Sequence, residues 1–215
     1  ISQDTIVIVN NGSASATVAG TGTPVSFKFK LNTPAGPIDS AIAGNSILVA
    51  SNVANSISGF SATSFSFLFN INSTSTFGAL SAPLAIARWQ FADGVFVLVD
   101  SKPTSGIGLA GRGTIRFLNS SNGLSIDELR DTFSTSSIYE DVAVSNNKRI
   151  FIADSGTNRI VVVRLDPFFG PPFGLGNELI YEGLAEFADS ITHTSIVSPK
   201  KIAISGNRGF VVNGG

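Results

Sequence analysis

The sequence contains no cysteine and no methionine, and it has only one histidine, His193. The absence of cysteine excludes disulfides, thiol nucleophiles and thiolate metal sites. A single histidine also excludes a three-histidine zinc site, and a Ser-His-Asp triad would have to use His193. This residue stands in the Ser/Thr-rich stretch 189–195 without a Gly-x-Ser-x-Gly motif, which is typical of a solvated loop rather than a catalytic site.

Charged residues are scarce, at 13% of the chain, and the formal net charge is −1. No run is rich in lysine or arginine, so the sequence predicts neither nucleic acid nor an anionic membrane surface as a partner. No run approaches the roughly 18 consecutive apolar residues that a membrane-spanning helix needs. We therefore expect no membrane insertion.

The lack of any methionine predicts that the chain is a processed or excised product, and a removed export signal is one explanation. Three Asn-x-Ser/Thr triplets, at Asn11, Asn72 and Asn119, would be glycosylation acceptors in an exported protein. The sequence thus predicts a secreted or cell-surface location.

Hydrophobic residues make up 43% of the chain, and the clearest pattern of strands and turns lies in residues 139–166. Val142 and Val144 alternate with less apolar residues, and a second apolar run at 150–152 follows an Asn-Asn-Lys turn. A Ser-Gly turn then leads into a third strand at 159–164, rich in β-branched residues. The pattern predicts a β-meander.

Within this stretch, the sequence Asp-Ser-Gly-Thr-Asn-Arg-Ile at 154–160 resembles the core of an NHL-type β-propeller repeat. The resemblance covers this copy well and the other copies loosely. It implies a propeller of four-stranded antiparallel blades. Calcium-dependent lactonases and esterases occur among NHL-like propellers, but the inner Glu and Asn residues that they use have no counterparts here.

The same meander recurs along the chain. Residues 47–57 match 150–160, residues 95–100 form an intermediate copy that also ends in aspartate, and 201–213 repeat the first two strands. Repeats of this length are typical of propellers. We predict blades that start near residues 37, 83, 139 and 199, and strands of a partial blade in residues 5–32.

The predicted fold class is therefore all-β, a single propeller domain or propeller fragment over residues 1–215. About four blades are expected, or part of a larger propeller, because a propeller needs about four to eight blades to close. Two closures are open: the terminal strands complete one blade together, or further blades are missing from this chain.

In a propeller, the start of the first strand and the end of the second strand of each blade lie on one face. The residues expected at that channel mouth are Asp39, Asp100, Glu140, Asp141, Asp154 and Asn213, with His193 in a neighbouring loop. Converging carboxyl and amide oxygens could hold Ca²⁺ as the only cofactor that we consider. The residues themselves favour a structural role, in which such an aspartate accepts turn amides or pairs with a nearby arginine, as Asp154 would with Arg159.

An aromatic, proline-rich stretch at 167–174 carries Phe168, Phe169 and Phe173. These rings are expected either to pack on the blades or to form an assembly contact with a partner or a sister subunit.

We therefore expect a non-enzymatic extracellular platform that binds protein or glycan, with self-association as a further possibility. The alternatives are a divalent-cation-dependent propeller hydrolase or lyase and a structural subunit of a surface filament. Fold alone does not decide between them.

Overall fold

The structure is a computed structural model that describes residues 31, 33–74, 78–89, 95–100, 114–130, 136–147, 149–165 and 185–214. Every regular element in these ranges is a β-strand. No helix long and apolar enough to cross a membrane occurs in this part of the chain.

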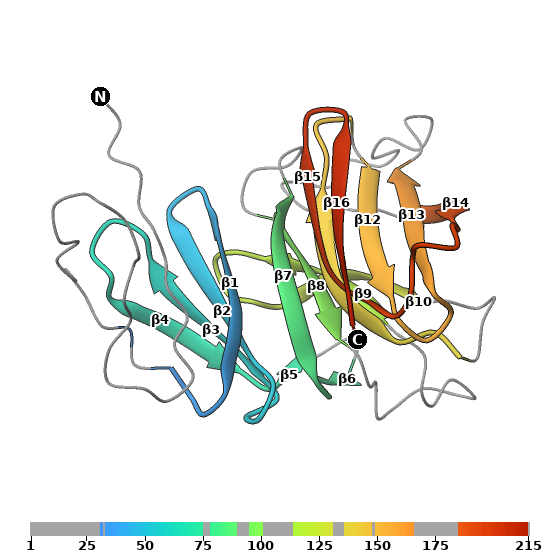
Figure 1. The fold of residues 1–215 in the computed structure, drawn as a ribbon. Helices are drawn as coiled ribbons and strands as arrows, with labels where there is room; N and C mark the ends of the chain where they lie inside the picture. The colour runs from blue at the N-terminus through green and yellow to red at the C-terminus, as the bar shows by residue number, and fades with distance from the viewer. Residues whose placement is uncertain are drawn as a thin grey trace, which may run out of the picture.

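The strands form sheets from neighbours in the sequence (Figure 1), and we call the four larger sheets blades 1 to 4. Blade 1 consists of β1 (Pro37–Ala43), β2 (Ser46–Ser51), β3 (Ser56–Ser61) and β4 (Phe67–Ile71). Blade 2 consists of β7 (Pro83–Trp89), β8 (Val95–Asp100), β9 (Thr114–Asn119) and β10 (Ser125–Arg130). Blade 3 consists of β11 (Tyr139–Val144), β12 (Arg149–Asp154), β13 (Arg159–Leu165) and β14 (Ala185–Ile191). Blade 4 is the hairpin of β15 (Pro199–Ser205) and β16 (Arg208–Asn213), and a small ladder of β5 (Ser73–Thr74) and β6 (Gly78–Ala79) lies between blades 1 and 2 in the sequence.

Each blade is an antiparallel meander whose strands come from one copy of the repeat, and among the described strands none is exchanged between the four blades. The first strands contact one another in chain order, β1 with β7, β7 with β11, and β11 with β15. The predicted all-β fold of repeated four-stranded antiparallel sheets is confirmed. The strands predicted in residues 5–32 fall outside the described residues except for residue 31, and the extent of the domain stays a prediction.

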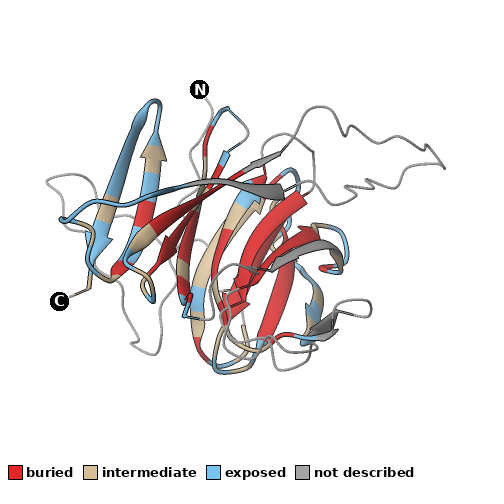
Figure 2. Ribbon diagram, turned by 90° about the vertical axis from the view of Figure 1, so that its right-hand side faces the viewer, coloured by how far each residue is buried: buried red, intermediate tan, exposed pale blue. Residues whose placement is uncertain are grey.

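Apolar side chains fill the spaces between successive blades. Alternate residues of a strand point to opposite faces of the sheet. A central strand with apolar residues at every position can therefore pack against the blade before it and the blade after it. In β8, Leu98 packs toward blade 1 while Val97 and Val99 pack toward blade 3. The middle strands are accordingly the most buried part of the molecule, as Figure 2 shows.

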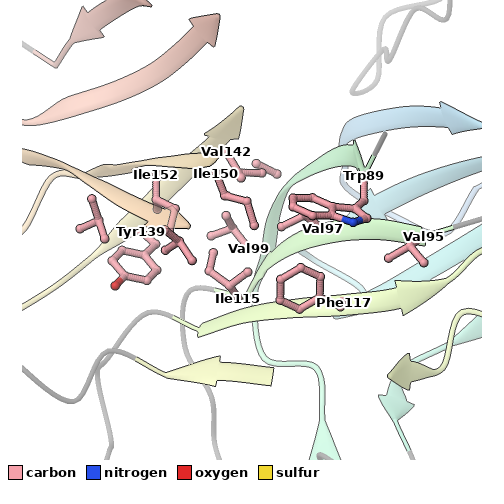
Figure 3. Packing of buried hydrophobic residues seen from close by; sticks show 13 residues of the cluster. Trp89, Val95, Val97, Val99, Ile115, Phe117, Tyr139, Val142, Ile150 and Ile152 are labelled. Carbon is pink, nitrogen blue, oxygen red and sulfur yellow. The ribbon is translucent and has the colours of Figure 1, made fainter. Parts of the chain in front are cut away.

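The largest of these clusters lies between blades 2 and 3 (Figure 3). Trp89 of β7 contacts Phe117 of β9 edge to face, with ring centroids 6.0 Å apart and planes at 88°. Ile150 and Ile152 of β12 lie across from them. A smaller cluster, which includes Ile160 and Ile202, joins blade 3 to blade 4. The core is therefore a series of apolar layers, each between two successive blades.

Candidate functional site

The first strand of every blade carries a register shift near its start, between Pro37 and Asp39 in β1 and at the equivalent places in β7, β11 and β15. Such bulges turn a side chain away from the regular alternation of the strand. The residue that follows the shift is Asp39 in blade 1, Ala85 in blade 2, Asp141 in blade 3 and Lys201 in blade 4. We call these four residues the bulge positions.

The two aspartates at the bulge positions bridge neighbouring blades. Asp39 Oδ2 accepts a hydrogen bond from the amide of Ile86 in β7 at 2.9 Å. Asp141 Oδ2 accepts one from the amide of Ile202 in β15 at 2.8 Å. In both bonds the aspartate belongs to the blade that precedes the blade of the amide. The amide in each case belongs to the residue directly after a bulge position, Ala85 or Lys201. The same carboxylate-to-amide bond thus joins blade 1 to blade 2 and blade 3 to blade 4, whereas Ala85 offers no acceptor to blade 3.

Lys201 adds a cation to the two carboxylates. The Nζ atom of Lys201 lies 3.5 Å from Asp141 Oδ1. Lys201 belongs to blade 4, whereas Asp39 belongs to blade 1. Burial raises the pKa of Asp39 above its ordinary value, while the amides of Ile86 and Ser40 and the Lys201 ammonium act to lower it and Asp141 acts to raise it. These three charged residues occupy the bulge positions of blades 1, 3 and 4. We call Asp39, Asp141 and Lys201 the axial cluster.

Glu140 lies beside the axial cluster and makes contacts of its own. Its Oε1 accepts hydrogen bonds from Ser155 Oγ at 2.8 Å and from Lys200 Nζ at 2.5 Å. Lys200 belongs to β15, so this partly exposed ion pair is a further link between blades 3 and 4. An exposed pair of this kind contributes about 0–1 kcal/mol to stability.

The candidates at the ends of the second strands hold the loop that precedes their own blade. Asp100 Oδ1 accepts from the amides of Ser81 at 3.0 Å and Ala82 at 2.8 Å. In blade 3, Asp154 Oδ1 accepts from the amide of Ile138 at 2.9 Å. Asp154 Oδ2 also accepts from Ser137 Oγ in this loop, and Asn213 Oδ1 accepts from the amide of Val197 at 3.2 Å. A bond from Thr157 Oγ1 to Asp154 Oδ2 closes the turn after β12. These side chains fasten each loop to its blade.

Both of these aspartates are fully buried and face an arginine. The predicted pair of Asp154 with Arg159 is present, with Oδ2 and Nε 3.1 Å apart. In blade 2, Asp100 Oδ2 lies 3.2 Å from Arg116 Nη2, and the exposed fraction of Arg116 is 1%. Because their carboxylates are already bonded to amides and guanidinium groups, Asp100 and Asp154 act as structural anchors.

The other predicted site residues divide into two groups. His193 is exposed in the turn after β14, where its Nδ1 accepts from the amide of Ser195 at 3.1 Å. Phe168, Phe169 and Phe173 lie outside the described residues. Among the residues that the structure describes, no group of three or more His, Cys, Asp or Glu side chains could hold a metal ion. A calcium site elsewhere in the chain stays a prediction.

The sequence interpretation missed Lys201 and Arg116. Lys201 takes the bulge position that aspartate occupies in two other blades, so only an alignment of the repeats on their bulges would have placed it in the cluster. Arg116 stands two residues further along its strand than Arg159 does, opposite Leu98 instead of the strand end. The position of Arg159 in blade 3 therefore did not predict that Arg116 would pair with Asp100 in blade 2.

Replacing Asp39 by asparagine should change how stability depends on pH. A carboxyl whose pKa is raised in the folded state stabilises the fold fully below its unfolded pKa of about 3.9, and this contribution is lost as pH rises through the folded pKa. The asparagine side chain does not ionise, and its amide oxygen can still accept from Ile86. Urea denaturation across this pH window should show that the free energy of unfolding of Asp39→Asn increases relative to that of the wild type as pH rises.

Lys201→Gln is the companion variant for this measurement. Without the ammonium that lowers it, the pKa of Asp39 should rise further, and the pH window should extend upward. A difference between wild type and Asp39→Asn that is the same at every pH would contradict the assignment.

Gly156 lies in the turn after β12, against the loop that Asp154 fastens. A Cβ at this position would lie 1.8 Å from the backbone oxygen of Ser136. Gly156→Ala should therefore lower the free energy of unfolding by about 1–3 kcal/mol, because the loop has to shift. Gly209→Ala is the control, since its new Cβ would meet only the Cδ1 of Ile204 at 3.3 Å. Equal losses for the two variants, measured by chemical denaturation, would refute the predicted close packing.

No family model and no curated protein matches the sequence. Solved structures, by contrast, share the fold. A protein from Lactobacillus plantarum is 11% identical with a TM-score of 0.58, over 86% of this chain and 51% of its own. A chain of the nidogen/laminin complex is 14% identical with a TM-score of 0.53, over 90% of this chain and 60% of its own. The computationally designed Ika4 protein is 13% identical with a TM-score of 0.51, over 88% of this chain and 100% of its own.

At these identities the likeness concerns the fold alone. This chain spans between half and two thirds of the length of the first two of these structures. The structural neighbours are β-propellers, in agreement with the all-β, four-stranded antiparallel sheets described above. The chain therefore has a β-propeller fold, while its assignment to the NHL type stays a prediction.

Proposed function

We propose that this chain is a non-enzymatic propeller, secreted or held at the cell surface, that serves as a binding or assembly platform for a protein or glycan. The observation that carries the proposal is a set of large apolar side chains left exposed on blades 1 and 4. The exposed fractions are 58% for Phe67 and 46% for Leu68 in β4, and 57% for Phe210 and 59% for Val212 in β16. Exposed apolar groups gathered on a sheet are typical of interaction surfaces.

The polar contacts of the blades support a rigid platform. Asp39, Asp100, Asp141 and Asp154 each accept hydrogen bonds from backbone amides, and these bonds fix blades and loops relative to one another. A surface that is already ordered loses little conformational entropy when a partner binds. One fold neighbour is a chain of a complex between two proteins, nidogen and laminin, which agrees with a role in protein binding.

The proposal is tested by binding of the purified chain to arrays of defined extracellular proteins and glycans. A double variant, Phe67→Ser with Leu68→Ser, should lose at least tenfold in affinity if the outer strand of blade 1 is part of the platform. The control is Val53→Ser, which changes a residue 69% exposed in the turn between β2 and β3. Binding that is equal in all three proteins would contradict the role of this strand.

Two further measurements separate the alternatives. Turnover of lactone or ester substrates that requires added Ca²⁺ would favour the hydrolase and contradict a non-enzymatic platform. Light scattering that shows polymers growing with protein concentration would indicate a filament subunit, whereas a monomer that binds its partner supports the proposal.

A further inference from the structure

We propose that an acidic, aliphatic segment of a partner protein binds over the contact between blades 3 and 4, at the end where β11 and β15 begin. Lys200 meets a carboxylate of that segment, and Ile138 and Val197 pack against its aliphatic side chains. We call Ile138, Glu140, Val197 and Lys200 the blade 3–4 patch. This inference rests on the proposed function as a protein-binding platform and names the place and chemistry of one contact.

Hydrogen bonds hold the blade 3 side of this patch in place. The amide of Ser155, in the turn after β12, donates to the carbonyl oxygen of Ile138 at 2.9 Å. The Ser155 hydroxyl donates to Glu140 Oε1 at 2.8 Å, and the same oxygen accepts from Lys200 Nζ of blade 4 at 2.5 Å. Ile138, Glu140 and Lys200 therefore belong to one connected group of residues that spans both blades.

The loop before β15 completes the patch on the blade 4 side. The amide of Val197 donates to Asn213 Oδ1 at 3.2 Å, and the amide of Ser198 donates to Asn158 Oδ1 at 2.7 Å. Asn158 lies in the turn between β12 and β13, so the second bond ties this loop to blade 3. Because β15 also contacts β11 and β12, the patch lies where blade 4 is fastened to blade 3.

Two large aliphatic side chains of the patch are open to solvent, although the backbone around them is held by hydrogen bonds. The exposed fraction is 46% for Ile138 and 52% for Val197. Transfer of such apolar surface from water onto a partner favours association. Because both segments are already ordered, covering them costs little conformational entropy. The partner segment therefore carries aliphatic side chains at this place.

The accessible charge of the patch is positive. The exposed fraction of the side chain is 45% for Lys200 but 20% for its partner Glu140. The neighbouring ion pair has the same asymmetry, with 55% for Lys201 and 10% for Asp141. An ammonium group has three donors, and Glu140 takes one of those of Lys200. A carboxylate of the partner can therefore bond to Lys200 beside Glu140, and this charge complementarity favours an acidic segment over a basic one.

The contact between blades 1 and 2 has a different chemistry at the same place. The register shift of each first strand leaves out one residue, which is Glu140 in blade 3 and Lys200 in blade 4. The residues left out in blades 1 and 2 are Ile38 and Leu84. This position carries no charge in blades 1 and 2, so an acidic partner is expected on blades 3 and 4.

The test uses the full chain and the labelled peptide Ser-Ile-Leu-Glu-Leu-Ile-Ser, with a control peptide that has glutamine in place of glutamate. We expect the acidic peptide to bind about tenfold more tightly than the control, and added salt to reduce the difference. Lys200→Gln should weaken binding of the acidic peptide about tenfold, whereas Glu140→Gln should tighten it about threefold, because it removes the carboxylate that competes for Lys200. Ile138→Ser should weaken it about fivefold, and Val53→Ser, at an exposed aliphatic residue of blade 1, should leave it unchanged.

The opposite effects expected for Lys200→Gln and Glu140→Gln separate peptide binding from a structural role. Each substitution breaks the same ion pair. If the pair served only to fasten blade 4 to blade 3, both variants would change peptide binding in the same direction.

Three results would overturn the inference. Lack of binding, or equal binding of the two peptides, would exclude recognition of a carboxylate at the patch. A shift in the same direction in both charge variants would show that the ion pair only fastens the blades. Binding of a heparin hexasaccharide that is lost in Lys200→Gln but not in Ile138→Ser would assign the patch to an acidic glycan. The proposed function survives each of these results if the array partner is still bound and still lost on substitution of Phe67 and Leu68.

Discussion

Replacing Asp100 by alanine should lower the free energy of unfolding by about 3–5 kcal/mol, because it removes one partner of a fully buried ion pair. Asp100 is inaccessible to solvent and Arg116 is 1% exposed, so water cannot take over the role of the carboxylate. The substitution also takes the hydrogen-bond acceptor away from the amides of Ser81 and Ala82. Urea denaturation followed by far-ultraviolet circular dichroism measures the loss.

The matched control removes both charges. In Asp100→Asn combined with Arg116→Met, no buried charge is left uncompensated, and the amide oxygen of the introduced asparagine can still accept from the loop. Replacing a whole buried pair by neutral groups of similar size is often close to neutral. The double variant should therefore be more stable than Asp100→Ala. A single variant that loses less than about 1 kcal/mol would show that the ion pair contributes no more than an exposed one.

The strands were predictable because two signals in the sequence agree at most positions. Continuous apolar runs marked β2, β8 and β12, and Gly, Asn and Asp turns separated them. The first strands of the blades begin at residues 37, 83, 139 and 199, where the repeats were expected to start. Local pattern and self-similarity were sufficient here because each sheet is made from one continuous piece of chain.

The contacts of the site were less predictable, because they depend on bulges and on neighbouring blades. A register shift of one residue sends Asp141 toward Ile202 of the next blade, and a strict two-residue period cannot anticipate it. The aspartates expected at the channel mouth make two kinds of contact, and their arrangement as a ring stays a prediction. Asp39 and Asp141 bridge blades, whereas Asp100 and Asp154 fasten loops within their own blade.

Of the described blade contacts, the one between blades 2 and 3 should be the most sensitive to loss of apolar packing. Blades 1 and 2, and blades 3 and 4, are joined by a carboxylate-to-amide bond in addition to their apolar layers. Ala85 stands at the equivalent position of blade 2, so no such bond reaches blade 3 from there. Packing around Trp89 therefore carries a larger share of the contact.

Trp89→Ala should consequently lower the free energy of unfolding by about 3–5 kcal/mol, the usual cost of truncating a large buried aromatic residue. Trp89 is 1% exposed and its edge-to-face contact with Phe117 adds about 0.5–1.5 kcal/mol beyond area burial. Trp89→Phe keeps an aromatic ring beside Phe117 and should lose clearly less. Phe210→Ala, at a ring 57% exposed, should stay within about 0.5 kcal/mol of the wild type. Denaturation curves in which Trp89→Ala loses no more than Phe210→Ala would mean that the blades are held together chiefly by their polar bridges.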